Sequence, residues 1–183
     1  VVSTLMGLGV FPSDHPQFLG MTGMHGSKAA NHAIHGADVV VAVGSRFSDR
    51  VTNNKLIYAE GKRVIHIDVD PAELDKNIPS HIALSGDLER LLPVLSQRVE
   101  KGSQTQWWQI IKEWQEKFEV NDGAEVLTAP WMLKALSKAT ADQPFIFATD
   151  VGQHQMWAAQ NLSLKSPRSW ITSGGLGTMG FGL

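Results

Sequence analysis

The sequence predicts an α/β protein built on parallel sheets, and two observations support this prediction. Apolar runs of strand length alternate with segments of helical periodicity, which is the pattern of βαβ units. Polar and glycine-rich turns directly follow these apolar runs, at the carboxyl ends of the predicted strands. Because doubly wound folds bind ligands at those ends, we expect the functional residues in these turns.

The composition indicates a globular protein with its own hydrophobic core. The 183 residues are 43% hydrophobic and 19% charged, with a formal net charge of −2. No basic stripe is present, so nucleic acid is excluded as the main partner. No apolar stretch reaches membrane-spanning length and no signal-peptide pattern occurs, so no membrane partner is expected. The lack of cysteine agrees with a cytoplasmic location, and both ends interrupt predicted elements, so we expect a segment of a longer chain.

A glycine-rich turn followed by a helix is the first candidate binding element. Residues 1–5 predict a strand and residues 10–21 a loop, before the turn and helix start at 23–31 and the helix over 28–35. Glycines allow close backbone approach to a ligand, Ser27 can cap the helix, and the free N–H groups of a helix start favour anions. An ordinary connection without a ligand explains the same turn equally well.

Two predicted strands, residues 38–43 and 63–71, end in charged groups. Arg46 and Arg50 follow the first strand, which favours a bound acid or phosphate, although a solvated salt-bridged loop is an alternative. Asp68 and Asp70 end the second strand, where an acid commonly accepts hydrogen bonds from ribose hydroxyls. The alternative is that these aspartates only initiate a turn before Pro71. A short strand at 81–84 and a helix at 88–99 complete this part.

Residues 101–130 differ in character and predict a boundary between domains. An apolar stripe at helical spacing predicts an amphipathic helix that packs against a core, and residues 121–124 break the chain. The stripe consists of Trp107, Ile110, Ile111, Trp114 and Phe118. We therefore divide the chain into a domain at 1–100, a helix and linker at 101–130, and a second domain at 131–183.

The second domain repeats the α/β pattern. A helix at 131–140, a strand at 145–149 and a strand at 168–172 are predicted. Gln153, His154 and Gln155 follow the first of these strands and could donate hydrogen bonds to phosphate, although His154 could equally be a capping or core histidine. A later run satisfies G-x-G-x-x-G, but a lone match is weak evidence for a dinucleotide site. No metal-ligand spacing occurs, so no metal site is expected within the chain.

Five runs, in order and spacing, resemble the large catalytic subunit of the acetohydroxyacid synthase (acetolactate synthase) family. The runs Gly-Gln-His-Gln-Met-Trp and Gly-Leu-Gly-Thr-Met-Gly-Phe-Gly are far more specific than a glycine pattern alone. The five runs are residues 4–9, 23–26, 42–51, 149–157 and 172–182. The resemblance implies a nearly complete FAD-binding middle domain followed by the first βα units of a thiamine-diphosphate domain.

The resemblance also implies an activity. Enzymes of this family decarboxylate pyruvate with thiamine diphosphate and join the two-carbon unit to pyruvate or 2-ketobutyrate, in the biosynthesis of valine, isoleucine and leucine. The expected partners are 2-keto acids, other large subunits in a homodimer or homotetramer, and a regulatory small subunit. We expect the 183-residue segment alone to be inactive, because the Mg2+ ligands of the family would lie beyond Leu183. The alternatives are another thiamine-dependent decarboxylase, carboligase or oxidase, and a non-catalytic nucleotide-binding module.

Site residues follow from the same resemblance. Arg50 corresponds to the arginine that binds the carboxylate of the second 2-keto acid, and Met24 corresponds to a residue at the substrate channel. The implied FAD contacts are His25, Gly26, Gly44, Ser45, Arg46, Asp68, Val69, Gly86 and Asp87. The implied thiamine-diphosphate contacts are Gln153, His154, Gly177 and Met179. The sequence departs from the family at Ser48, where aspartate is frequent, and at Thr22, where leucine is common.

Overall fold

The computed structural model describes residues 1–119 and 127–183, and the predicted break at 121–124 lies outside these described residues. Contacts divide the chain into two units, each with its own core. Unit 1 contains Val1–Asn31 and Lys117–Leu183, and unit 2 contains His32–Glu116.

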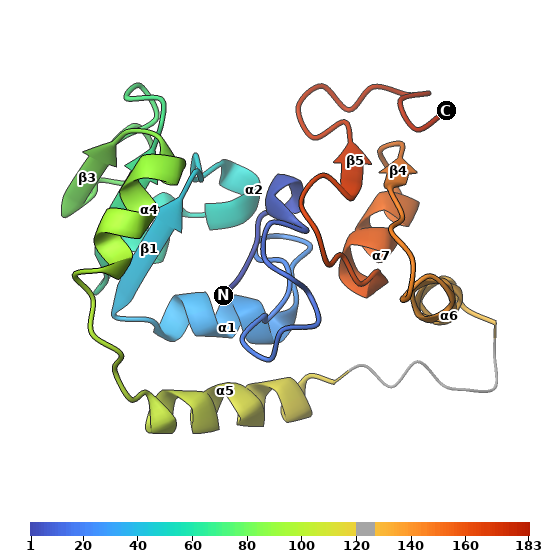
Figure 1. Ribbon diagram of the computed structural model, residues 1–183, viewed down its shortest axis with the longest axis horizontal. Coiled ribbons are helices and arrows are strands. Elements are labelled where there is room, and N and C mark those ends of the chain that lie inside the picture. Colours follow the sequence, from blue (N-terminus) through green and yellow to red (C-terminus); the bar gives the residue numbers. More distant parts are fainter. Residues whose placement is uncertain (120–126) are drawn as a thin grey trace. The chain divides into compact units, whose positions relative to one another are not determined.

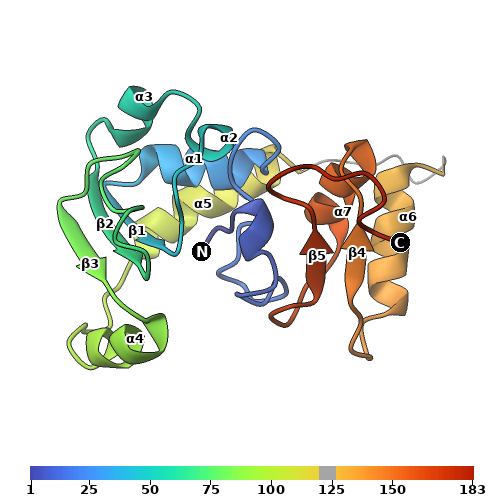
Figure 2. The ribbon, with the colours of Figure 1, turned by 90° about the horizontal axis from the view of Figure 1, so that it is seen from above.

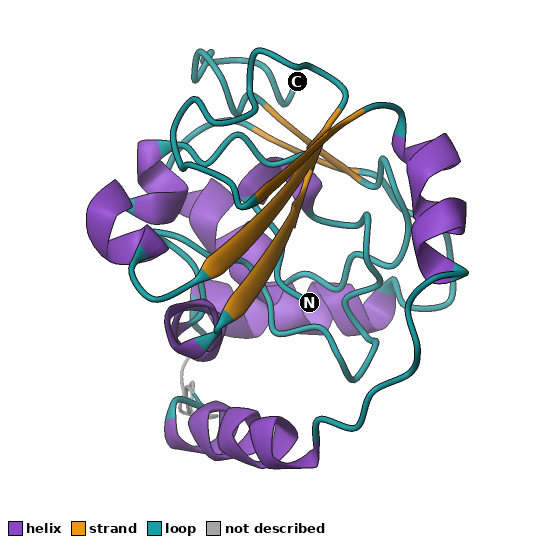
Figure 3. Cartoon of the chain, turned by 90° about the vertical axis from the view of Figure 1, so that its left-hand side faces the viewer, coloured by secondary structure: helices purple, strands orange, loops and turns teal. Residues whose placement is uncertain are grey.

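Unit 2 is built on a three-stranded parallel sheet. Strands β1 (Val39–Val43), β2 (Arg63–Asp68) and β3 (Ile82–Ser85) lie in that order, and they are coloured orange in Figure 3. Val41 of β1 pairs with Ile65 of β2, which in turn pairs with Ile82 of β3. The parallel pairing confirms the predicted α/β class, since parallel neighbours require a crossover connection.

One face of this sheet forms a core, while the opposite face is covered at Ile67 and exposes other apolar side chains. Ala42 and Val64 point to the same side, because strand side chains alternate, and they pack with Phe47 and Ile78. Tyr58 covers this cluster, and its burial raises the pKa of the phenol to about 12. On the opposite face several apolar side chains are exposed, for example Val41 at 55%. This second set comprises Val39, Val41, Val43 and Ile82.

The sequence predicted the longer helices of unit 2 but not its two shortest ones. Helices α1 (Lys28–Gly36), which begins in unit 1, and α5 (Thr105–Lys117) confirm the predicted helix and the predicted aromatic stripe. Helix α4 (Leu88–Ser96) ends three residues earlier than predicted. Helices α2 (Asp49–Thr52) and α3 (Lys55–Ala59) were not predicted, because neither is long enough to show a period.

The aromatic stripe packs against α1 within unit 2, as a core-facing stripe should. Trp107 and Trp114 meet edge to face with ring centroids 5.6 Å apart, and Trp114 lies 5.5 Å from the ring of His32. A Cβ atom at Gly36 would lie 3.3 Å from both indole rings. The small residue at this position therefore permits the close approach of the two tryptophans.

Unit 1 contains a two-stranded parallel sheet with two helices beside it (Figure 2). Its elements are α6 (Ala129–Ala139), β4 (Phe147–Thr149), α7 (Gln153–Asn161) and β5 (Trp170–Thr172), with a 3-10 helix, η1 (Leu5–Gly7), near the amino terminus. Strand β4 starts two residues later than predicted. The predicted strand at 1–5 is reduced to a single bridge between Ser3 and Met21, because the chain turns into η1 at Leu5.

The first residues of the chain pack against α7 and the strands of unit 1 (Figure 1). Leu8 and Met21 share a core with Ala158 and Ala159 of α7 and with Trp170 of β5. The backbone N–H of Ser13 donates to the carbonyl oxygen of Leu164 at 3.1 Å, which adds a polar tie to this apolar core. No helix in residues 1–119 or 127–183 is long and apolar enough to cross a membrane.

A buried hydrogen-bond group fixes α7 to this sheet and gives a first testable prediction. Gln155, only 2% exposed, donates from Nε2 to Oγ1 of Thr172 at 2.6 Å, and the hydroxyl of Thr149 lies 3.0 Å from the same oxygen. Replacing Thr172 by valine leaves the buried amide of Gln155 without this acceptor, so we expect a loss of about 2 kcal/mol in the free energy of unfolding. Urea denaturation of the full-length protein measures it.

The matched control is Thr178→Val, because Thr178 is exposed and no described contact depends on its hydroxyl. An equal effect of both substitutions would contradict the assigned role of the Gln155 hydrogen bond.

Candidate functional site

The glycine-rich turn of residues 22–27 is closed by its own backbone and by one side chain. Asn31 accepts the N–H of Gly23 at Oδ1 (2.8 Å) and donates from Nδ2 to the carbonyl oxygen of Gly23 (2.9 Å). The hydroxyl of Thr22 donates to the same Oδ1 at 3.0 Å. Thr22, which departs from the family pattern, therefore supplies a hydrogen bond that leucine could not make.

Ser27 caps α1, as predicted. Its Oγ accepts the N–H of Ala30 at 3.1 Å and donates to the carbonyl oxygen of Leu19 at 2.8 Å. The side chains of Met24 and His25 are exposed at the tip of the turn, Met24 at 69%. The predicted channel residue and the predicted flavin contact thus lie side by side on a closed turn.

The second group of predicted residues surrounds the start of α7 in unit 1. Gln153 and His154 begin the helix and are exposed, so His154 is not the core histidine of the alternative. The prediction for Gln155 was wrong, because its side chain is buried and donates to Thr172 in the sheet. The first N–H groups of a helix have no acceptor inside it, so this end suits an anion such as a diphosphate. Gly177 and Met179 are also exposed, Met179 at 92%, in the glycine-rich loop after β5.

Asp150 connects the start of α7 to that glycine-rich loop. Its Oδ1 accepts the N–H of Gly182 at 2.6 Å and its Oδ2 accepts the N–H of Gly180 at 2.7 Å. These two hydrogen bonds, that of Gly182 first, hold the pKa of the carboxyl below its usual range, and the charge of His154 acts in the same direction. The carboxylate therefore holds the loop that carries Gly177 and Met179.

Removing this charge is expected to loosen the loop. In Asp150→Asn the amide can accept at only one atom, so the backbone N–H groups of Gly180 and Gly182 should exchange faster with deuterium at pH 7. Because the pKa of Asp150 is lowered by folding, its stabilisation is complete above the unfolded value of about 4 and is lost as pH falls through the folded value.

Hydrogen exchange of the full-length protein, followed by mass spectrometry between pH 3 and 7, tests both statements. Asp142→Asn is the matched control, because Asp142 is exposed and makes no described hydrogen bond with its carboxylate. A loop whose exchange is the same in Asp150→Asn and the control would contradict the prediction.

The third group lies in unit 2, where the three parallel strands end at one edge. The N–H of Gly44 donates to the carbonyl oxygen of Ile67 at 2.8 Å, and the N–H of Gly86 donates to that of Asp68 at 3.0 Å. Gly44, Asp68 and Gly86 therefore lie next to one another, with Ser45 and Arg46, Val69, and Asp87 directly after them. Gly44 has φ of +60° and nothing within 4 Å of a Cβ position, which leaves space above its backbone.

The arginines at this edge are held outward by the residue between them. Phe47 adopts the left-handed conformation at φ 49° and is only 2% exposed, packed 5.0 Å from the ring of His66. This turn of the backbone buries the phenylalanine and leaves Arg46 and Arg50 exposed. In the described ranges neither guanidinium belongs to an ion pair, so the alternative of a salt-bridged loop is not what these residues form.

The aspartates at this edge also organise local turns. Asp68 is 8% exposed and its Oδ1 accepts the N–H of Asp70 at 2.9 Å, while Asp70 accepts that of Ala72. Both aspartates therefore have the turn-forming role that was one alternative, which leaves Oδ2 of Asp68 outside these bonds. Asp87 caps α4 through the N–H of Glu89 at 2.9 Å. Ser48 precedes α2 and makes no side-chain cap.

His66 is a buried polar residue that the sequence did not single out. It is 0% exposed, neither ring nitrogen has a hydrogen-bond partner in the described part of the chain, and Nε2 lies 4.0 Å from Oδ2 of Asp68. Buried polar atoms ordinarily have a hydrogen-bond partner. The two ring nitrogens of His66, beside the acid at the end of β2, have none within the described residues.

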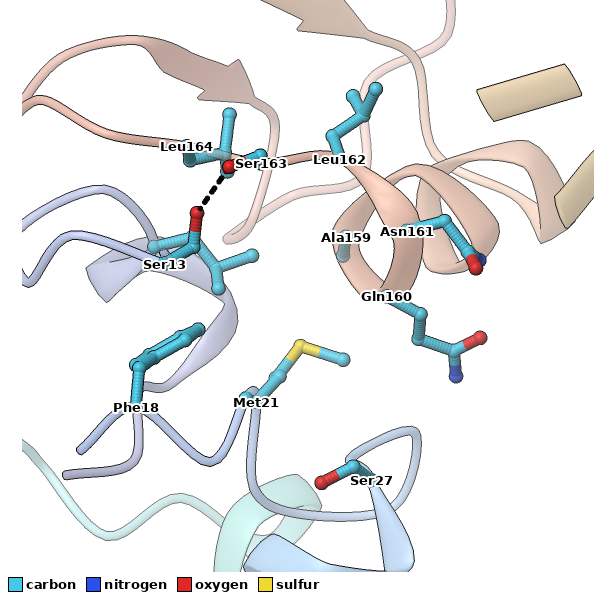
Figure 4. Close-up of a pocket in the computed structure, with 12 residues that line it drawn as sticks. Ser13, Phe18, Met21, Ser27, Ala159, Gln160, Asn161, Leu162, Ser163 and Leu164 are labelled. Carbon is cyan, nitrogen blue, oxygen red and sulfur yellow. Dashed lines mark hydrogen bonds between the residues drawn. The ribbon is translucent and has the colours of Figure 1, made fainter. Parts of the chain in front are cut away.

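A pocket of about 270 Å³ lies in unit 1, between the amino-terminal segment and the second half of α7 (Figure 4). Phe18 and Met21 line it from one side and Gln160 and Leu162 from the other. The hydroxyls of Ser13 and Ser163 are 3.0 Å apart at its rim. None of the residues predicted to contact a cofactor or substrate lines this pocket, but Ser27 of the turn and Gln160, whose side chain binds the turn, do.

The structure therefore brings the predicted residues together in three groups, and besides the buried His66 it adds three residues whose contacts the sequence did not indicate. Unit 1 contains the turn of Met24, His25 and Gly26 and the start of α7. Unit 2 contains the strand-end group and Arg50. The added residues are Asn31, Asp150 and Gln160, and Gln160 contacts the turn by donating from Nε2 to the carbonyl oxygen of His25 at 2.8 Å. Asn31 and Asp150 lie within the segments 23–31 and 149–157 singled out in the sequence, but both bind backbone groups of glycines, so those segments do not identify the contacts.

Two family models match the sequence. Residues 1–95, slightly more than half of the chain, match "Thiamine pyrophosphate enzyme, central domain". The chain belongs to the thiamine pyrophosphate enzymes. Residues 150–183 match the "C-terminal TPP binding domain" of the same enzymes, which places the α7 end and the glycine-rich loop in a cofactor-binding domain. Thiamine diphosphate is thus the cofactor that the family supports.

Curated relatives are similar over the whole chain. The "Acetolactate synthase isozyme 2 large subunit" of Escherichia coli K12 is 47% identical over 98% of this chain and 32% of its own length. The "Acetolactate synthase large subunit" of Haemophilus influenzae is 45% identical over 100% of this chain and 33% of its own length. "Acetolactate synthase 1, chloroplastic" of Oryza sativa subsp. japonica is 42% identical over 100% of this chain and 30% of its own length. The chain spans about a third of the length of these relatives.

The resemblance seen in the sequence is therefore confirmed, as is the thiamine-enzyme fold class. The family models leave residues 96–149 unmatched, and the contact-based units group the first 31 residues with the carboxyl-terminal part. The limits 1–100, 101–130 and 131–183 stay a prediction, and so do the individual roles of the site residues.

Proposed function

We propose that this chain is the middle third of an acetolactate synthase large subunit. The proposed enzyme decarboxylates pyruvate and joins the two-carbon unit to pyruvate or 2-ketobutyrate, in branched-chain amino-acid biosynthesis in the cytoplasm. The observation that carries the proposal is identity of 40–47% along the whole chain to curated large subunits, from bacteria to a plant. We further propose FAD and Mg2+ as cofactors, and an assembly of large subunits with a regulatory small subunit.

The groups at the start of α7 fit a thiamine diphosphate. The helix start offers free N–H groups to a diphosphate, and Gln153 and His154 are exposed there to donate further hydrogen bonds. When bound, thiamine diphosphate supplies the stabilisation of the carbanion that decarboxylation leaves. In this proposal Gly177 and Met179 lie beside the thiamine ring, and Asp150 keeps their loop in place through Gly180 and Gly182.

The strand-end group of unit 2 fits an FAD nucleotide. Gly44 leaves space for close approach, and Arg46 is exposed for a phosphate. Within the described residues Oδ2 of Asp68 accepts no hydrogen bond, and it lies 4.0 Å from Nε2 of His66. The remaining proposed contacts, Ser45, Val69, Gly86 and Asp87, follow the same strand ends. His25 and Gly26 are proposed contacts from the turn in unit 1.

Arg50 is proposed to bind the carboxylate of the second 2-keto acid. Its guanidinium is exposed, carries a permanent charge and can form two parallel hydrogen bonds to a carboxylate. Met24 is proposed to present an apolar side chain to the substrate channel of the enzyme. Both residues act by binding and orienting, so their substitution should change the use of the 2-keto acid before it changes cofactor affinity.

The test uses the full-length protein supplied with thiamine diphosphate, FAD and Mg2+. Formation of acetolactate from pyruvate, and of the corresponding product from added 2-ketobutyrate, is the expected result. A folded protein that binds thiamine diphosphate in calorimetry yet only consumes oxygen with pyruvate, or only condenses glyoxylate, would identify another enzyme of the family. The absence of any thiamine-diphosphate binding would overturn the proposal.

A further inference from the structure

The glycine-rich turn of unit 1 is connected to α7 by one long-range hydrogen bond. Nε2 of Gln160 donates to the carbonyl oxygen of His25 at 2.8 Å, across 135 positions of sequence. We propose that Gln160 is a positioning residue, which fixes the turn carrying Met24 and His25 at a set distance from the cofactor end of α7. This inference rests on the proposed function, because that function assigns roles to both ends of the connection.

The turn is closed by its own hydrogen bonds. Asn31 holds both backbone groups of Gly23, and the N–H of Ser27 donates to the carbonyl oxygen of Met21 at 2.9 Å. The internal bonds therefore preserve the shape of residues 22–27, and Met21, directly before the turn, packs against Ala158 and Ala159 of α7. Neither contact reaches the exposed tip of the turn, and the bond from Gln160 to His25 connects that tip to α7.

Helix α7 is held firmly at its other points of contact. Gln155 binds Thr172 in the sheet, and Ala158 and Ala159 belong to the core of unit 1. The helix axis is thus fixed independently of the turn. A side chain on α7 can then act as a reference point for the turn.

The spacing along α7 links the two ends. Gln153 and Gln160 are seven residues apart, which is nearly two helical turns, so their side chains leave the helix in almost the same direction about 10 Å apart. The proposed diphosphate contact and the contact to the turn therefore lie along one side of one rigid element. The bond to His25 transfers this spacing to the residues at the tip of the turn.

Burial does not hold the tip of the turn in place. Met24 is 69% exposed and His25 is exposed, while Gln160 lines the pocket beneath the turn (Figure 4). Without apolar contacts at the tip, a single hydrogen bond has a large share in its position. Loss of the donor should therefore displace the turn without unfolding it.

The experiment compares three variants of the full-length protein. Gln160→Glu removes the donor and sets a carboxylate against the carbonyl oxygen, whereas Gln160→Lys retains a donor of sufficient length. Gln115→Glu adds the same charge at an exposed position of α5 that makes no described side-chain contact. Hydrogen exchange of residues 22–27 is measured without cofactors, and thermal unfolding and the kinetics of the 2-keto acid are measured beside it.

We expect residues 22–27 of Gln160→Glu to exchange about tenfold faster, and kcat/KM for the 2-keto acid to fall about tenfold, at an unchanged Tm. Gln160→Lys should recover most of both effects, and Gln115→Glu should match the wild type. Unchanged exchange of the turn in Gln160→Glu, or faster exchange throughout the protein with a lowered Tm, would overturn the inference. An inactive wild-type protein would instead contradict the proposed function, and the exchange measurement would still decide the role of Gln160.

Discussion

Substitution of Arg50 by alanine is expected to lower kcat/KM for the second 2-keto acid by about 100-fold in the full-length protein. Hydrogen bonds between a guanidinium and a carboxylate contribute about 1.5–3 kcal/mol, and 100-fold corresponds to about 2.7 kcal/mol. Arg50 is exposed, while the buried Thr52 in the same short helix donates to the carbonyl oxygen of Ser48 at 3.1 Å and so fixes the helix. Steady-state kinetics with varied 2-keto acid give the value.

Arg50→Lys distinguishes the fork from the charge, because lysine keeps the charge but loses the parallel pair of donors. We expect an intermediate loss for this variant. Arg63→Ala is the matched control, since Arg63 is exposed at the amino end of β2, the end opposite to Asp68. A loss of less than twofold in Arg50→Ala would remove Arg50 from the substrate site.

Alanine at Gly26 is expected to destabilise the protein by about 3 kcal/mol. A Cβ atom there would overlap the carbonyl oxygen of Met21 and would lie 2.7 Å from the carbonyl carbon and Cα of Thr22. These are backbone atoms of the closed turn, which cannot rotate away as a side chain could, so the turn must open to accept the methyl group. The urea midpoint of the full-length protein measures the loss.

Gly102→Ala provides the comparison, because the nearest atom to its Cβ position is Nε2 of Gln104 at 3.5 Å, the end of a movable side chain. We expect a change below about 0.5 kcal/mol for this exposed position. Equal midpoints for the two variants would show that the turn adapts to a side chain at Gly26.

The sequence predicted those helices and strands that neighbouring residues determine, through strand propensity or a helix cap. The run of β-branched residues predicted β1, and Ser27 indicated the start of α1, which its hydrogen bond to Ala30 confirms. The strand predicted at 63–71 corresponds to β2, which ends three residues earlier, at Asp68, because Asp68 and Asp70 accept backbone N–H groups in turns. Helices α2 and α3 were missed because four and five residues show no period. One signal was present: Asn54 caps α3 by accepting the N–H groups of Leu56 and Ile57.

The candidate site was predictable where a motif carries its residues and not where folding brings partners together. The runs that contain Gln153 and Met24 can be recognised from the sequence alone. The contact of Gln160 with His25 spans 135 positions, and Asp150 binds backbone N–H groups about 30 residues later, so neither contact leaves a pattern in the sequence. The predicted strand at residues 1–5 was wrong, because the chain enters η1 after a single bridge between Ser3 and Met21.

The exposed apolar side chains of the unit 2 sheet have a practical consequence for handling the protein. Val39, Val41 and Val43 of β1 and Ile82 of β3 leave apolar surface exposed on either side of β2, and parallel sheets are ordinarily covered on both faces. Surfaces of this kind attract other chains through the same hydrophobic effect that builds a core. Recombinant production of these 183 residues by themselves is therefore expected to yield protein that aggregates and forms inclusion bodies. Detergent or a charged substitution at Val41 should increase the yield of protein in solution.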